Sequence, residues 1–147
     1  MHREPNLIII ADDDPDDSLF LLTALLSLPL ELTVITVPNG ERLISILEKV
    51  SPQIIFLDIN MPKKNGFDAL KHIRSNVRSE QPTVIMFSTS TSVLDIRMSQ
   101  QLGADMYVTK PHTIQNYNMI IEDIFKRDWS GKATERIPEK LLLSHFQ

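Results

Sequence analysis

The stretch LIIIADDDPDD, residues 7–17, decides the fold because a continuous apolar run passes directly into a cluster of acids. An uninterrupted apolar run such as Leu7 to Ala11 is typical of a strand buried on both faces, as strands of parallel sheets are. Pro15 and the acids around it suit the first turn of a helix, where proline costs no hydrogen bond and the helix dipole favours negative charge. The stretch therefore predicts a buried strand that ends in acids and is followed by a helix.

Strand-like and helix-like segments alternate five times over residues 5–127, which we interpret as one domain. The expected strands are 7–11, 32–37, 54–57, 84–87 and 106–108. The expected helices are 16–27, 41–50, 66–74, 92–102 and 113–126. Single helices between successive strands imply right-handed crossovers. The predicted fold class is therefore α/β, with a five-stranded parallel sheet and helices on both of its faces.

Composition limits the classes of function. The 147 residues are 42% hydrophobic and 23% charged, as in a globular protein. A net charge of −4 argues against a broad surface for nucleic acid, so we expect no nucleic-acid partner. The absence of cysteine excludes disulfides and cysteine nucleophiles. The apolar stretch 19–30 is interrupted and too short to span a bilayer, so we expect a cytoplasmic protein without a membrane partner.

Two segments are more apolar than a solvated surface requires. Leucines and a phenylalanine point around most of the circumference of the first helix, which predicts that something covers its outer face. The C-terminal tail, residues 128–147, holds Trp129, Ile137 and three consecutive leucines. We expect the helix to dock a partner, or the tail to pack on the domain or on a second copy, which would make a homodimer.

The candidate site follows from the topology. In a parallel sheet covered on both faces, ligands bind beyond the carboxyl ends of the strands. The polar residues expected there are Asp12, Asp13, Asp58, Ser88 and Lys110. Three crowded carboxylates need a cation, and oxygen ligands favour a hard ion such as Mg²⁺. A carboxylate can attack a phosphoryl group, and a metal ion and a lysine would stabilise charge on the transferred oxygens.

The other acids of the opening stretch are interpreted differently. Asp14, Asp16 and Asp17 are expected to cap the helix and to favour its first turn, rather than to bind a ligand.

Four motifs in this order resemble the receiver domain of response regulators, the CheY-like superfamily. Residues 7–17 are similar to its opening and 56–66 to its phosphoacceptor motif. Residues 86–89 are similar to its switch segment and 107–111 to its lysine-proline motif. The resemblance covers the whole predicted domain. It implies a doubly wound, flavodoxin-like sheet with strand order 2-1-3-4-5.

The resemblance implies a role for each matching residue of the acidic site. Asp58 would accept the phosphoryl group. Asp12, Asp13 and Asp58 would hold Mg²⁺, with Asn60 adding its backbone carbonyl. Lys110 would pair with the phosphoryl oxygens.

The same resemblance implies a switch beside the site. Ser88 would offer its hydroxyl to the phosphoryl group, Tyr107 would swing inward with it, and Pro111 would follow a cis peptide bond. Ser88 stands where threonine is commoner in the family, Thr89 where alanine is frequent, and His112 where an aromatic is common.

The function implied is two-component signal transduction by a stand-alone receiver. Asp58 would take the phosphoryl group from a phosphohistidine of a sensor histidine kinase, and the change would alter binding of a downstream protein target. The chain would not be an enzyme beyond slow self-phosphorylation and dephosphorylation. Three alternatives stay open: a phosphoryl shuttle in a phosphorelay, a pseudo-receiver without phosphorylation, and a haloacid-dehalogenase-type phosphatase. The phosphatase would need an aspartate where Asn60 stands.

Overall fold

The computed structural model describes residues 6–76 and 80–126. The strands there are β1 (Leu7–Ala11), β2 (Thr33–Val37), β3 (Ile54–Leu57), β4 (Thr83–Ser88) and β5 (Met106–Thr109). The helices are α1 (Pro15–Leu26), α2 (Gly40–Leu47), α3 (Gly66–Ser75), α4 (Val93–Leu102) and α5 (Ile114–Phe125). The tail lies outside the described residues, so its packing stays a prediction.

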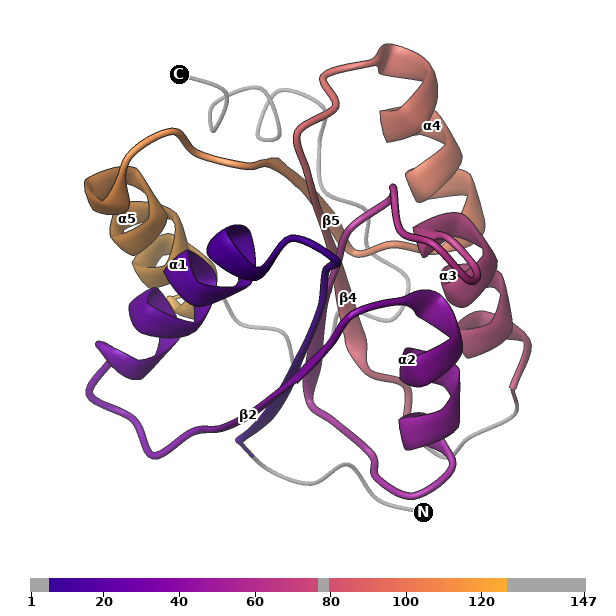
Figure 1. Ribbon diagram of the computed structural model, residues 1–147, viewed down its shortest axis with the longest axis horizontal. Coiled ribbons are helices and arrows are strands. Elements are labelled where there is room, and N and C mark those ends of the chain that lie inside the picture. The colour runs from indigo at the N-terminus through magenta and orange to yellow at the C-terminus, as the bar shows by residue number, and fades with distance from the viewer. Residues whose placement is uncertain (1–5, 77–79, 127–147) are drawn as a thin grey trace.

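The described strands form one parallel sheet in the order β2-β1-β3-β4-β5, which confirms the predicted fold class and strand order. Figure 1 shows α1 and α5 on one face of the sheet, and α2, α3 and α4 on the other. The side chains of β1, β3, β4 and β5 are buried throughout, whereas β2, at one edge, is partly exposed. The continuous apolar runs of the sequence are therefore the core of the sheet.

Local chemistry sets the helix ends. The Asp14 carboxylate accepts the amides of Asp16 and Asp17 at 2.9 and 3.2 Å, and Pro15 occupies the first helical position of α1. At the C-terminal end of α4, Gly103 has φ 103°, a left-handed conformation that glycine adopts without strain.

One predicted boundary differs by more than a single residue. Helix α2 ends at Leu47 instead of residue 50, where the amides of Glu48 and Lys49 donate to carbonyls three residues back, those of Ser45 and Ile46, at 3.3 and 2.9 Å. Within the described ranges, no helix combines the length and apolarity that a bilayer crossing demands.

Candidate functional site

The backbone of the site is fixed because the hydrogen bonds of the sheet continue past the strand ends. The amide of Asp12 donates to Val37 at 3.0 Å, and the amide of Asp58 donates to Ala11 at 2.9 Å. The amide of Lys110 donates to the Ser88 carbonyl at 2.8 Å. Residues that lie far apart in the sequence therefore meet at the carboxyl ends of the strands.

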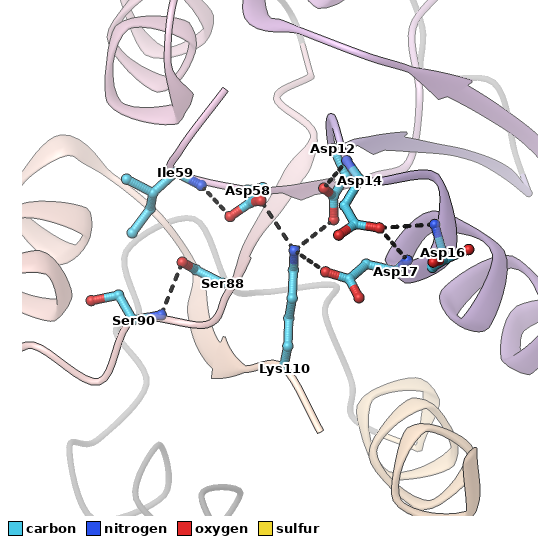
Figure 2. A network of polar contacts seen from close by, with 9 residues as sticks. All are labelled: Asp12, Asp14, Asp16, Asp17, Asp58, Ile59, Ser88, Ser90 and Lys110. Carbon is cyan, nitrogen blue, oxygen red and sulfur yellow. Dashed lines mark hydrogen bonds and ion pairs between the residues drawn. The ribbon is translucent and has the colours of Figure 1, made fainter. Parts of the chain in front are cut away.

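The Lys110 ammonium lies at the centre of the site. Its Nζ atom is 2.8 Å from Asp12 Oδ2, 2.9 Å from Asp17 Oδ2 and 3.1 Å from Asp58 Oδ2 (Figure 2). An ammonium has three N–H donors, so each of these carboxylates can take one. The site thus brings β1, α1 and β3 together around one side chain from the end of β5.

The two buried carboxylates are also oriented by backbone amides. Asp12 Oδ1 accepts the amide of Asp14 at 2.9 Å, and Asp58 Oδ1 accepts the amide of Ile59 at 2.8 Å. Helix α3 begins directly against this segment: a Cβ on Gly66 would lie 2.2 Å from the Asp58 carbonyl oxygen. Only glycine lets the backbone of α3 approach the Asp58 peptide so closely.

Burial and charge act in opposite directions on the ionisable groups. Burial raises the pKa of Asp12 to about 6, although Lys110 works against that shift. Burial alone would lower the pKa of Lys110, but its hydrogen bonds to Asp12 and Asp17 outweigh burial and raise it. The shift of the Asp12 pKa favours its neutral acid form, whereas the shift of the Lys110 pKa favours its charged ammonium. Three carboxylates within 3.1 Å of the Nζ atom favour a charged Lys110.

The acids expected to bind a metal ion do lie together. Oxygen atoms of Asp12, Asp13 and Asp58 all lie within 4.8 Å of one another, and Asp13 is exposed. Three carboxylates with hard oxygens this close together suit a divalent cation such as Mg²⁺. Asn60, the fourth predicted ligand, is exposed two residues after Asp58, and its carbonyl contact stays a prediction.

The predicted switch residues converge on Ser90. Ser88 is fully buried, and its Oγ accepts the Ser90 amide at 3.2 Å (Figure 2). Tyr107 is buried as well, and its hydroxyl donates to the Ser90 carbonyl at 2.7 Å. Burial raises the pKa of Tyr107, so the neutral phenol that donates this bond is favoured. The aromatic side chain therefore occupies the inward position.

Two interpretations from the sequence need correction. The peptide bond before Pro111 is trans, like every other in the described ranges, so the expected cis bond is wrong. The trans form is the intrinsic preference by about 0.5–1 kcal/mol.

The interpretation of Asp17 as a helix-start acid alone is incomplete. Asp17 does lie in the first turn of α1, but its carboxylate also pairs with Lys110. Its place in the first turn of a helix that begins beside Asp12 puts Asp17 near the site, but the contact with Lys110 depends on the rotation of that helix.

Comparison with known proteins agrees with this geometry. The response regulator receiver domain family matches residues 8–122. The transcriptional regulatory protein CpxR of Escherichia coli K12 is 37% identical over 129 residues, which cover 85% of this chain and 52% of that protein. The nitrate/nitrite response regulator protein NarL of the same organism is 31% identical over 145 residues, or 96% of this chain and 61% of NarL. The chain thus spans about half the length of the curated relatives that it matches.

Solved structures share the fold. The phosphorylated cyanobacterial phytochrome response regulator RcpA is 27% identical with a TM-score of 0.78, over 86% of this chain and 95% of that one. The bacteriophytochrome response regulator RtBRR is 28% identical with a TM-score of 0.69, over 92% of this chain and 86% of that one.

Proposed function

Because the chain belongs to the response regulator receiver domain family and so to two-component signalling, we propose that Asp58 is the aspartate that accepts the phosphoryl group. The observation that carries the proposal is the pairing of Asp58 with Lys110 inside the acidic cluster. Both side chains are buried and their charged atoms are 3.1 Å apart. A carboxylate beside a cation and two further acids is equipped to receive a group that carries negative charge.

The bonds that form and break in the transfer step involve only the donor and the Asp58 carboxylate. One oxygen of Asp58 attacks the phosphorus of a phosphohistidine; the O–P bond forms, the P–N bond breaks, and its electron pair stays on the imidazole nitrogen. Lys110 lies close enough to pair with the transferred oxygens. Mg²⁺, held by Asp12, Asp13, Asp58 and the Asn60 carbonyl, would supply further positive charge to the phosphoryl oxygens. The acyl phosphate is later hydrolysed or passed on.

The switch starts at Ser88. Its hydroxyl accepts the amide of Ser90, so a turn of the hydroxyl toward a phosphoryl oxygen changes the contact that supports Ser90. Ser90 also accepts the Tyr107 hydroxyl, so the loop before α4 and strand β5 respond together. The face formed by α4, β5 and α5 would then change its preference for a downstream protein target. Helix α4 already exposes Val93 and Leu94 there.

The input surface is proposed on α1, where Leu19, Phe20 and Leu26 are exposed. A pocket of about 310 Å³ lies beside this helix and is lined by Asp13, Leu19 and Val37, among others. Apolar side chains next to the acidic site suit a sensor histidine kinase whose phosphohistidine must reach Asp58.

A small acyl-phosphate donor tests the central claim. The chain is incubated with acetyl phosphate and Mg²⁺, and its intact mass is measured. We expect one phosphoryl adduct, which Asp58→Asn and a metal chelator each abolish and which the exposed-acid control Asp16→Asn retains. An adduct that persists in Asp58→Asn would place the acceptor elsewhere. Rapid turnover of the donor without adduct would favour a phosphatase, and no reaction would favour a pseudo-receiver.

A further inference from the structure

Asp17 belongs to the site although it lies outside the three-acid cluster. It is the second residue after Pro15 in α1, and its Oδ2 is 2.9 Å from the Lys110 Nζ atom. That distance is shorter than the 3.1 Å between Lys110 and Asp58. Asp17 therefore contacts the cation at least as closely as the proposed acceptor does.

Lys110 donates hydrogen bonds to Asp17 and Asp58 and forms an ion pair with Asp12, so three carboxylates surround an ammonium that has three N–H donors. A phosphoryl group on Asp58 brings three further oxygens to the same cation, so the acceptors around Lys110 then outnumber its donors. The side chain of Asp17 is 26% exposed, compared with 6% for Asp12 and 8% for Asp58. Water can solvate a released Asp17 more readily than either buried acid, so Asp17 is the acceptor that is released at the least cost.

Asp17 also changes the charge of the site. With one divalent ion and Lys110, the ionised Asp12, Asp13 and Asp58 sum to zero, because three negative charges meet three positive ones. Asp17 adds one negative charge only 2.9 Å from the cation. An incoming phosphoryl group is negative, so this extra charge opposes its transfer to Asp58.

We propose that Asp17 is a positioning residue that holds the Lys110 ammonium toward α1 and slows acceptance of the phosphoryl group by Asp58. This inference rests on the proposed role of Asp58. It assigns the first turn of α1 a part in setting the phosphorylation rate, in addition to its part in starting the helix.

The chain offers a matched control. Asp16 is exposed, precedes Asp17 in the same helical turn, and contributes its backbone amide, not its carboxylate, to the cap at Asp14. Asp16→Asn removes the same charge and the same favourable interaction with the helix dipole as Asp17→Asn does. The two variants differ in the contact with Lys110.

The test compares adduct formation in the parent chain and in three variants, Asp17→Asn, Asp16→Asn and Asp17→Glu, by intact mass after timed incubation with acetyl phosphate and Mg²⁺. We expect Asp17→Asn to gain the adduct about three- to tenfold faster, since one opposing charge near the reacting atoms is removed. Asp16→Asn should match the parent, and Asp17→Glu should restore the slow rate. An equal or lower rate in Asp17→Asn overturns the inference.

A second measurement needs no donor. The side-chain ammonium of Lys110 is followed by ¹⁵N NMR in all four proteins. We expect its signal to move in Asp17→Asn and to stay in place in Asp16→Asn. An unmoved signal in Asp17→Asn overturns the inference even when the parent is phosphorylated normally. A parent that gains no adduct, with a Lys110 signal that responds to Asp17→Asn, rejects the role of Asp58 and with it the effect on rate.

Discussion

Lys110 shows how one side chain can organise a site. Only 5% of Lys110 is exposed, and burying an ammonium costs free energy unless hydrogen bonds and opposite charges compensate for the lost water. Asp12, Asp17 and Asp58 meet that need from three separate elements, β1, α1 and β3. The same three contacts hold the carboxylates close together, where they would otherwise repel one another. The cation and the acids are therefore stable only in combination.

Tyr117 allows a prediction about pH at the same scale. Its ring packs between Phe20 and Phe87, with centroids 5.8 and 5.7 Å away. Burial raises its pKa to about 12 from 10.0, and the charge of Asp17 adds to the shift. A folded pKa above the unfolded one means that the neutral phenol stabilises the fold below pH 10. That contribution is lost as the pH rises from 10 toward 12.

We expect Tyr117→Phe, which keeps the ring and removes the ionising group, to resist high pH better than the parent. Between pH 9 and pH 11 the parent should lose about 1.4 kcal/mol more of its free energy of unfolding, because over this range the Tyr117 phenol ionises in the unfolded chain but stays neutral in the folded one. Urea unfolding at the two pH values measures the difference. Equal losses in both proteins would show that Tyr117 does not titrate as its burial implies.

The loop between β4 and α4 is a compact relay at the scale of elements. Ser90 donates its hydroxyl to Asp95 Oδ2 at 2.6 Å, while its amide and carbonyl contact Ser88 and Tyr107. Ser92 caps α4 through the amide of Asp95. Residue 90 thus connects the end of β4, the start of α4 and the side chain from β5.

Ser90→Ala should loosen this loop while the hydrogen bonds of the Ser90 amide and carbonyl stay in place. The lost hydroxyl donates to a charged group at a partly buried site and accepts the amide of Ser92 at 3.2 Å, so we expect the free energy of unfolding to fall by about 1–2 kcal/mol. Amide hydrogen exchange should become faster in the loop and in the first turn of α4. Thr91→Ala, at an exposed neighbouring position, is the control. Unchanged exchange in α4 would mean that the Ser90–Asp95 bond does not hold the helix.

At the scale of the whole molecule, the sequence predicted most of the fold because buried parallel strands are continuous apolar runs. Asp12, Asp58 and Lys110 could be placed in one site because the carboxyl ends of parallel strands share an edge. The contact of Asp17 could not, because it depends on the rotation of α1 relative to β5. The inward position of Tyr107 is likewise set by packing between elements, which no local pattern encodes. The cis bond expected before Pro111 was implied by the resemblance, and the structure has the trans form that is the intrinsic preference.

The sheet also separates two exposed apolar faces. Leu19 and Leu26 lie on α1, whereas Leu94, 76% exposed, lies on α4, and Figure 1 shows these helices on opposite faces of the sheet. Exposed apolar groups of this kind are typical of binding surfaces when they gather on one helix. If α1 receives the kinase and α4 contacts the target, substitutions on the two helices should have separable effects.

We expect the double variant Leu19→Gln, Leu26→Gln to accept the phosphoryl group from acetyl phosphate at the parent rate, since glutamine adds no charge near Asp58. Transfer from a phosphohistidine kinase that phosphorylates the parent should fall about tenfold, because two apolar anchors are worth roughly 1–2 kcal/mol together at a docking surface. Leu94→Gln should keep both reactions and weaken only the capture of targets that bind the phosphorylated chain. Timed phosphotransfer followed by intact mass separates these cases. If Leu94→Gln slowed kinase transfer as much as the α1 variant, the kinase would dock on the α4 side, and the division of the molecule into an input face and an output face would be wrong.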